Sequence, residues 1–417
     1  MSRRAPFLRL ALPVTLGLAP FFACNVYDES LLGSALDAAA SSSGELVGGR
    51  GIGYWSGPGQ FACQSAGKPT FADKPAPAPD PDGKNEPDIV VALRRIDLGT
   101  TDPVDGGAAT DQWKRLGFDV DGLCTGSSQT CAQSGGPACA PRQGQIAIDG
   151  EYCRDNSFGN LATTLTYASS LTSSFGFGAF DCALCVGSFN FLVRIQGYNG
   201  EPNDDTVDVD FFPSTGLVTP TPFDCKDPDL PDSACFVPGA PWKIDRSVIV
   251  GADAATSIST LRGVQAFVKN GYVTIILPPA GFPITFPGSD ALIRPFPVTV
   301  HQGFITGRLK RQPDATWHVE DGMIGGSTTL GEVLDSLVGI GVCPGTTEYV
   351  AAQTTIDNVA DVLGTGEIAP GTPCDSVSVG IGFTAYQATL GPPDQGQIHD
   401  YCTPSSASDA GTDGGFR

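Results

Sequence analysis

The stretch GVQAFVKNGYVTIIL, residues 263–277, is the clearest structural signal in this chain of 417 residues. Two apolar runs rich in β-branched residues flank the dipeptide Asn270-Gly271. Asn and Gly both tolerate positive φ, which makes this dipeptide the strongest short signal for a tight β-hairpin. The sequence therefore predicts two antiparallel strands here, at 263–269 and 272–277.

Further strands are predicted on both sides of this hairpin. Residues 298–309 and 317–324 form a second hairpin around Gln312-Pro313-Asp314, and 376–389 alternates as a long closing strand. Such alternation places one face of a strand on a core. Upstream, the same reasoning predicts strands at 89–97, 113–120, 188–196 and 206–212.

Helices are predicted in three places. Thr329 and Glu332 have the spacing of a capping box, and apolar residues follow them at helical intervals. A second apolar stripe begins at Tyr349 and ends before Gly364, a residue type that commonly terminates helices. A third helix is predicted within 158–171.

Composition agrees with a strand-rich fold. The chain contains 53 Gly and 34 Pro, which favours many turns over long helices. Strands and helices do not alternate along the chain, which disfavours a parallel βαβ architecture. We therefore predict a mainly β protein, a large antiparallel β-sandwich or jelly-roll-like body with two to three accessory helices.

The N-terminus has the layout of an export signal. Arg3 and Arg4 precede an apolar run at 7–23, and Cys24 follows it directly. This arrangement resembles the lipobox of bacterial lipoproteins, in which the cysteine thiol is acylated and becomes the new N-terminus. Phe21 stands where that family prefers Leu, and an ordinary signal peptide cut elsewhere is the alternative. The resemblance implies a membrane anchor and a location in the cell envelope, at the outer membrane or cell surface.

We predict four parts along the chain. Residues 1–23 are a signal peptide, and residues 24–88 are a flexible tether rich first in Gly and Ser and then in Pro and Asp. Residues 89–402 form the folded body, and residues 403–417 form a disordered tail of Ser, Asp and Gly.

Thirteen cysteines support export independently. With Cys24 as the lipid carrier, an even set remains, which in an exported chain predicts a disulfide framework. Short sequence separation favours Cys225 with Cys235 and Cys343 with Cys374. Four further cysteines are expected to pair among themselves: Cys124, Cys131, Cys139 and Cys153.

Cys182-Ala183-Leu184-Cys185 is a CxxC motif that allows three interpretations. A redox pair requires a βαβ setting, which is not predicted here. A zinc site requires a second CxxC or a His pair, and His301, His318 and His399 are scattered. We predict structural disulfides, either within the motif or from each cysteine to another partner.

The formal charge of −21 restricts the partners of this protein. So acidic a chain is repelled by nucleic acid and by anionic lipid surfaces. We therefore predict no nucleic-acid partner. Divalent cations, cationic partners or neutral glycans fit better. The alternative interpretation is that the charge only confers solubility.

Two acidic clusters offer the oxygen ligands that Ca²⁺ binds, and calcium is the one cofactor that the sequence suggests. The first lies at the entry to the strand at 206–212 and comprises Asn203, Asp204, Asp205 and Asp208. The second contains Asp80 and Asp82 in a D-x-D-G loop that lacks the distal Glu of an EF-hand. Solvated acidic loops are the alternative interpretation of both clusters.

Asp208 and Asp210 are also weak candidates for a catalytic carboxylate pair. Residues two apart on a strand project from one face, at a separation of about 6–7 Å between Cα atoms. Retaining glycosidases hold their two carboxyl groups about 5–5.5 Å apart, so the spacing is admissible. A half-exposed strand with outward polar residues has the same pattern, and we assign no catalytic residue with this spacing alone.

Other catalytic and binding motifs are absent from the sequence. There is no G-x-S-x-G, H-E-x-x-H, P-loop or dinucleotide fingerprint. Trp113, Trp242 and Trp317 lie on or beside predicted strands, where they either stack sugar rings or pack in the core. The sequence therefore favours a protein that is not an enzyme.

Three segments of the body, 89–99, 118–124 and 153–159, resemble uncharacterised cysteine-rich exported lipoproteins of gliding, predatory Gram-negative bacteria. The resemblance implies a location and no activity. Our hypothesis is a cell-surface lipoprotein that binds a glycan or an envelope protein without catalysis. A secreted carbohydrate-active hydrolase and a purely structural envelope scaffold are the alternatives.

Overall fold

The computed structural model describes residues 66–77, 85–100, 109–126, 136–144, 146–168, 177–221, 223, 234–251, 258–286, 296–339, 342–395 and 402. All of them belong to one compact unit, Gly44–Arg417. The predicted signal peptide, tail and most of the tether lie outside the described residues. So do the candidate site residues Cys24, Asp80, Asp82, Cys131 and Cys225.

Strands dominate the fold, which confirms the predicted mainly β class. The central sheet contains β1 (Ile89–Asp97), β3 (Asn190–Gln196), β4 (Asp208–Leu217), β5 (Ala240–Asp245), β8 (Gln265–Lys269), β9 (Tyr272–Ile276), β10 (Phe282–Phe286), β11 (Phe296–Arg311), β12 (Trp317–Thr329) and β14 (Ser376–Asp394). Two small sheets pair β2 (Cys139–Ala140) with β13 (Ala369–Pro373), and β6 (Ile249–Val250) with β7 (Ile258–Ser259). The α-helices of the described residues are α2 (Ser157–Ala168), α3 (Phe177–Val186), α4 (Leu330–Gly339) and α5 (Thr347–Val359).

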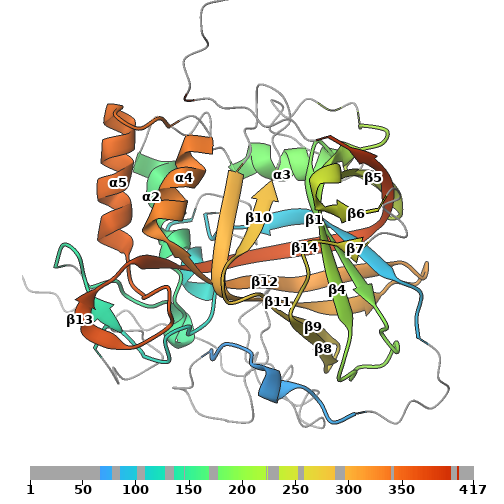
Figure 1. The fold of residues 1–417 in the computed structure, drawn as a ribbon, viewed down its shortest axis with the longest axis horizontal. Coiled ribbons are helices and arrows are strands. Elements are labelled where there is room, and N and C mark those ends of the chain that lie inside the picture. Colours follow the sequence, from blue (N-terminus) through green and yellow to red (C-terminus); the bar gives the residue numbers. More distant parts are fainter. Residues whose placement is uncertain are drawn as a thin grey trace, which may run out of the picture. The chain divides into compact units, whose positions relative to one another are not determined.

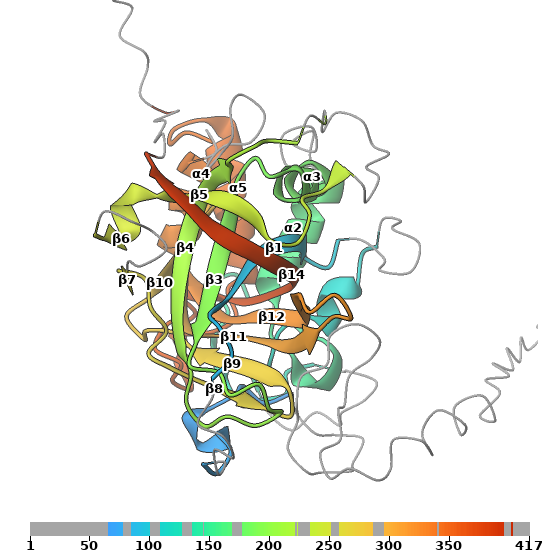
Figure 2. The same ribbon diagram turned by 90° about the vertical axis from the view of Figure 1, so that its right-hand side faces the viewer.

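The strand β14 joins the parts of the central sheet (Figure 1 and Figure 2). It pairs antiparallel with β12 on one edge and with β1 on the other, and its last residues pair parallel with β5. Because β1 continues through β3 and β4 to β5, this part of the sheet closes on itself. The other arm runs from β12 through β11 and β9 to β8.

Both predicted hairpins are present. β8 and β9 pair around Asn270, with φ of 52°, and Gly271, with φ of 80°. β11 and β12 form a longer ladder than predicted, with two breaks in register. The closing strand is also longer than predicted and continues to Asp394.

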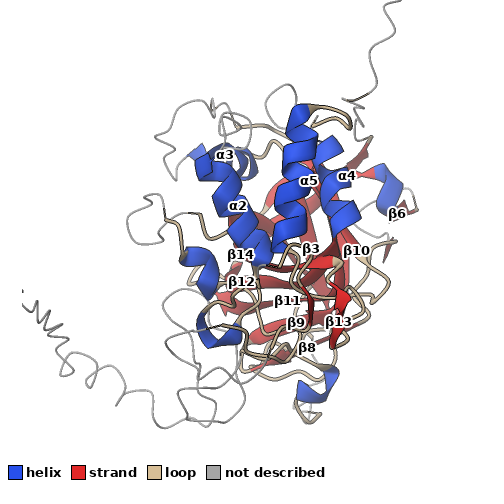
Figure 3. Cartoon of the chain, turned by 90° about the vertical axis from the view of Figure 1, so that its left-hand side faces the viewer, coloured by secondary structure: helices blue, strands red, loops and turns tan. Residues whose placement is uncertain are grey.

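The two arms of the sheet face each other across one apolar core, which gives the body its sandwich-like packing. Phe282 of β10 packs against Phe191 of β3 and Phe211 of β4, with ring centroids 6.4 and 4.7 Å apart. Helices α2, α4 and α5 pack against one another beside β11 and β14, and α3 lies against β1 (Figure 3). The capping box is confirmed, because Thr329 N–H donates to the Glu332 carboxylate and Glu332 N–H donates to the Thr329 hydroxyl.

Two local predictions are wrong. Residues 113–120 are not a strand: Gln112–Arg115 is a 3-10 helix, and the chain then crosses the sheet with two isolated bridges. Helix α5 has its C-cap at Ala360 rather than ending before Gly364. In both places the apolar residues that follow the observed helix are buried by distant parts of the fold, a contact that sequence periodicity does not report.

The disulfides follow the fold rather than sequence proximity. Cys124 bonds Cys153, within the predicted group of four, but Cys139 bonds Cys374. The predicted pairs Cys225–Cys235 and Cys343–Cys374 are wrong. Their described members pair instead as Cys185–Cys235 and Cys343–Cys402. Tertiary packing decides the pairs, because two cysteines can bond only where the fold brings their Cα atoms to about 4.4–6.8 Å. The β2–β13 pairing does so for Cys139 and Cys374.

The CxxC motif lies in α3 and is a structural element. Cys185 bonds Cys235, and Cys182 is also disulfide-bonded. Both side chains are buried. The two cysteines of the motif therefore belong to separate disulfides, as one of the two predicted structural arrangements requires.

We predict that the Cys139–Cys374 disulfide contributes more stability than Cys124–Cys153. Their sequence separations are 235 and 29 residues, and the unfolded chain loses more entropy when the longer loop is closed. Replacing Cys139 and Cys374 together by Ser should lower the free energy of unfolding about 2 kcal/mol more than the equivalent Cys124 and Cys153 change. Denaturant titration measures both values, and an equal or smaller loss would contradict the prediction.

Candidate metal centre

The candidate site is built on a chain segment that crosses the outer face of β12 and β14. Gly117 N–H donates to the Met323 sulfur at 3.3 Å, and the Phe118 ring meets Phe304 at 4.5 Å. A Cβ at Gly380 would lie only 2.6 Å from the Gly117 Cα, so the two backbones touch. This close approach fixes the position of the residues that follow, beginning with Asp119.

Five aspartates gather beside this contact from three separate parts of the chain: Asp119, Asp121, Asp149, Asp155 and Asp361. Ligand oxygens of Asp119, Asp121 and Asp155 all lie within 4.8 Å of one another. Asp149 and Asp361 lie close enough to act electrostatically on this group. The fold thus brings together carboxyl groups that are far apart in the sequence.

Backbone N–H groups hold these carboxylates in place. Val120 N–H donates to Asp155 at 2.7 Å, and Gly122 N–H donates to Asp119 at 2.6 Å. Leu123 N–H donates to Asp121 at 2.7 Å. The loop 119–123 carries Asp119 and Asp121, and its N–H groups bind these two carboxylates and that of Asp155. Its conformation therefore depends on the positions of all three.

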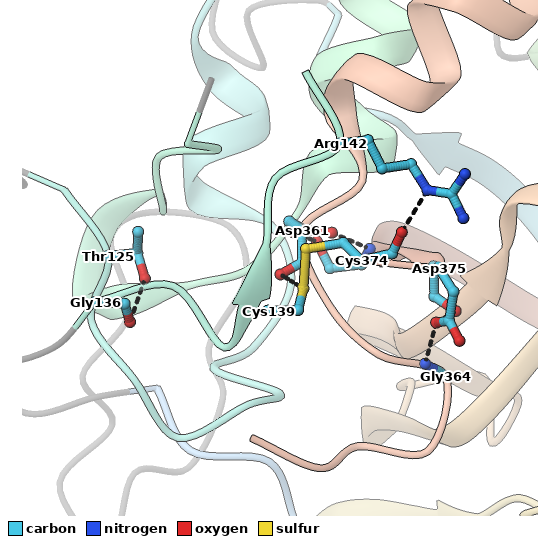
Figure 4. The surroundings of a disulfide bond; sticks show 10 residues. Thr125, Gly136, Cys139, Arg142, Asp361, Gly364, Cys374 and Asp375 are labelled. Carbon is cyan, nitrogen blue, oxygen red and sulfur yellow. Dashed lines mark hydrogen bonds between the residues drawn. A yellow bond between two sulfur atoms is a disulfide. The ribbon is translucent and has the colours of Figure 1, made fainter. Parts of the chain in front are cut away.

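The Cys139–Cys374 disulfide lies beside Asp361, one of the five aspartates (Figure 4). The Cys139 sulfur contacts the Asp361 carbonyl oxygen at 3.2 Å, and the Arg142 side chain donates to the Cys374 carbonyl oxygen at 2.6 Å. The Asp361 carboxylate accepts from the Ser378 N–H at 2.8 Å and from the Ser378 hydroxyl. Asp361 is thus held between the disulfide and β14.

Burial and mutual repulsion raise the pKa values of these carboxyl groups. Burial is the largest cause, and it raises the pKa of Asp121 and of Asp149 to about 7 and that of Asp361 to about 6. The fully buried Asp155 has its pKa raised well above the usual value by burial and then by its acidic neighbours. A buried group of like charges is stable only when protons or a cation neutralise it.

A small cavity opens beside Asp121. Its volume is about 10 Å³, close to what one water molecule needs. Ser327 lines the cavity and is only 4% exposed. Lys68 and Gln302 line it as well. The cavity admits one oxygen atom or a small ion and is too small for a sugar ring.

The donor set selects the class of cation. Every ligand atom that converges here is a carboxylate oxygen. Hard cations such as Ca²⁺ take six to eight oxygen ligands, whereas Zn²⁺ prefers nitrogen and sulfur. The residues fit calcium best.

The calcium candidates predicted from the sequence lie elsewhere and do not converge. Asn203 accepts from the Asn270 N–H at 3.0 Å, and Asp204 accepts from the Asn199 N–H at 2.8 Å. Asp205 pairs with Lys74, and Asp208 is exposed at the start of β4. These side chains hold a turn against the β8–β9 hairpin, and calcium binding there stays a prediction.

The weak catalytic pair Asp208 and Asp210 also differs from expectation. Asp210 is 1% exposed, and its carboxylate is bound by the guanidinium groups of Arg194 and Arg262. The alternative interpretation, a half-exposed strand with both aspartates facing solvent, is also wrong, because Asp210 is buried. The two arginines occupy the oxygens that a catalytic acid or nucleophile would use.

Trp113, Trp242 and Trp317 are all buried. Trp242 packs inside the closed part of the sheet against Phe236, and Trp317 meets Tyr198. The core interpretation of these three residues is therefore confirmed. None of them presents a flat surface to a sugar.

Comparisons with protein-family models, with curated proteins and with solved structures found no match. The resemblance to exported lipoproteins of gliding bacteria therefore stays a prediction. Among the described residues, no helix combines the length and apolar character that a membrane span requires.

We predict that the metal-free protein becomes less stable as the pH rises from about 5.5 to 7.5. A carboxyl whose pKa is raised by folding holds a proton that the unfolded chain has released, so stability falls as the pH rises through that window. Thermal unfolding in EDTA should show a Tm lower by a few degrees at the higher pH.

Asp149→Asn is the informative variant, because it removes one titrating member of the cluster, and the fall in Tm should become smaller. Asp208→Asn, on an exposed aspartate, is the matched control and should leave the fall unchanged. The same fall in all three proteins would contradict the assignment of the titration to the cluster.

Proposed function

We propose that this protein is an exported, envelope-anchored binding module that holds a calcium ion between Asp119, Asp121 and Asp155. The observation that carries the proposal is the convergence of their ligand oxygens within 4.8 Å of one another. Calcium would organise the face formed by the loop 119–123 and the neighbouring strands. The module binds an envelope partner and performs no catalysis.

Charge balance supports a cation at this position. The electrostatic neighbours of Asp121, Asp149 and Asp155 within the cluster are other aspartates. Lys68 is nearby, but its ammonium group donates to the Val120 carbonyl oxygen at 2.8 Å and not to a carboxylate. A divalent cation neutralises the group without breaking any of the backbone hydrogen bonds that shape it.

The surface supports a protein partner over a glycan. The tryptophans that would stack sugar rings are buried, and the cavity beside Asp121 is too small for one. Val250 and Ile258 are cross-strand neighbours in the β6–β7 ribbon and are 62% and 52% exposed. We take this exposed apolar pair as part of the contact surface for a protein partner, since apolar surface that a partner covers contributes to association.

Calcium binding is tested with the whole mature protein. Added calcium should raise the Tm, and the gain in free energy of unfolding should grow with the logarithm of the calcium concentration, to about 2.7 kcal/mol at a hundredfold excess over the dissociation constant. Native mass spectrometry should show one retained calcium that EDTA removes. A Tm and a mass that do not respond to calcium would overturn the proposal.

Asp121→Asn separates a ligand from a merely structural residue. Removing one negative charge should leave the protein in EDTA at least as stable as the wild type at neutral pH, because repulsion falls. The same variant should bind calcium at least about tenfold more weakly, since a charged ligand is lost. Equal destabilisation with and without calcium would contradict a ligand role.

Asp208→Asn serves as the matched control for calcium binding and as the test of the hydrolase alternative. It should bind calcium like the wild type, because Asp208 lies outside the cluster. Polysaccharide turnover by the wild type that disappears in this variant would favour the hydrolase instead.

The membrane anchor is tested by intact mass. Protein extracted from its own membranes should begin at Cys24 and carry a diacyl or triacyl group, which the resemblance to the lipobox implies. Cys24→Ser should abolish the acyl mass and release the protein from the membrane fraction. An unlipidated wild-type chain would contradict the anchor and would make the protein a soluble secreted one.

A further inference from the structure

Residues 66–68, which we call the strap, contact the body although they fall within the predicted tether. Ala66 N–H donates to the Tyr152 carbonyl oxygen at 2.8 Å, and the Ala66 carbonyl accepts from the Asp119 N–H at 2.9 Å. Gly67 forms a parallel bridge with Asp119, and Ala66 is buried. The strap therefore adds a short extended segment to the loop that carries the acidic residues.

The strap also forms part of the candidate metal centre. Lys68 lines the cavity beside Asp121, and its ammonium group donates to the Val120 carbonyl oxygen. Val120 lies between the two loop aspartates and donates its own N–H to Asp155. Val120 is thus held by the strap through its carbonyl oxygen and by the Asp155 carboxylate through its N–H.

We propose that the strap is the closing wall of the cation site, so that cation binding and strap docking stabilise each other. The proposal rests on the proposed function, since it requires a cation at Asp119, Asp121 and Asp155. Its consequence is that calcium determines whether residues 66–68 of the predicted tether are held on the body. The strap is a regulatory element for the site and supplies no ligand of its own.

The direction of this coupling follows from the hydrogen bonds. Ligand loops bind an ion tightly only when their conformation is fixed in advance. The strap fixes the loop through the backbone hydrogen bond from Asp119 to Ala66 on one side of Gly67 and through the Lys68 ammonium group on the other. Coupling between two sites is reciprocal, so an ion that orders the loop must also favour the docked strap. Calcium would instead displace the strap if the Lys68 ammonium group neutralised the carboxylates in its place. That group binds the Val120 carbonyl oxygen and not a carboxylate.

Hydrogen exchange of the full mature chain tests the coupling directly. The probe is calcium alone, compared with EDTA at one fixed pH. Calcium should slow exchange of the Ala66 amide, which bonds outside the cluster, to the Tyr152 carbonyl. Unchanged exchange at Ala66 while calcium is bound would overturn the proposal. Faster exchange would overturn it as well and would identify Lys68 as a displaced counter-cation.

Ala66→Pro provides the second measurement. Proline removes the N–H that bonds to Tyr152 and leaves the body strands untouched. Calcium affinity by titration calorimetry should fall by about 5- to 20-fold. Ala76→Pro, at an exposed position in the same Pro-rich segment, is the matched control and should bind calcium like the wild type.

The outcomes separate the two proposals. Calcium binding of equal affinity in wild type and Ala66→Pro would overturn the strap while leaving the cation site intact. Absence of calcium binding to the wild type would overturn both. A variant that had lost its fold would be recognised by a collapsed Tm in EDTA, and the wild-type exchange measurement would then decide alone.

Discussion

The hydrogen-bond ladder of β14 is the constraint on which the remaining structure depends. This strand pairs with β12, β1 and β5 along different parts of its length, so the closed part of the sheet and the open arm share one backbone. Its glycine at position 380 allows Gly117 to lie directly on it. That contact places Asp119 and Asp121 beside Asp155, while Ser378, two residues earlier, holds Asp361. The acidic centre is thus a consequence of how one strand is packed.

The local parts of the fold could be predicted from the sequence because their signals are local. Asn270-Gly271 encodes its turn through positive φ, and Thr329 with Glu332 encodes a helix start through two reciprocal hydrogen bonds. The disulfides could not be predicted in the same way. Cys139 meets Cys374 only because β2 and β13 pair, and nothing near either cysteine in the chain signals that pairing.

The candidate site could not be predicted for the same reason, because its residues come from distant parts of the sequence. Reasoning from the sequence selected acids that are neighbours in the chain, at 203–208 and at 80–82, and the first group proved to hold a turn. The converging acids come from segments around 119, 155 and 361. One signal was available: Asp119-Val120-Asp121-Gly122 repeats the D-x-D-G pattern that drew attention to Asp80 and Asp82. Its partners become visible only when the chain is folded.

The pairing of β1 with β14 also determines when folding can be completed during synthesis. Val91, near the start of the body, pairs with Gln387, near its end, so the first strand stays without one neighbour until almost the whole chain has been made. Contacts between residues so far apart in the sequence make folding slow, and an unpaired strand edge invites association with other chains. With such a topology, the yield of folded protein depends on chaperones that shield β1 and on the order in which cysteines are oxidised. Production of this protein is therefore expected to depend on the folding machinery available to it.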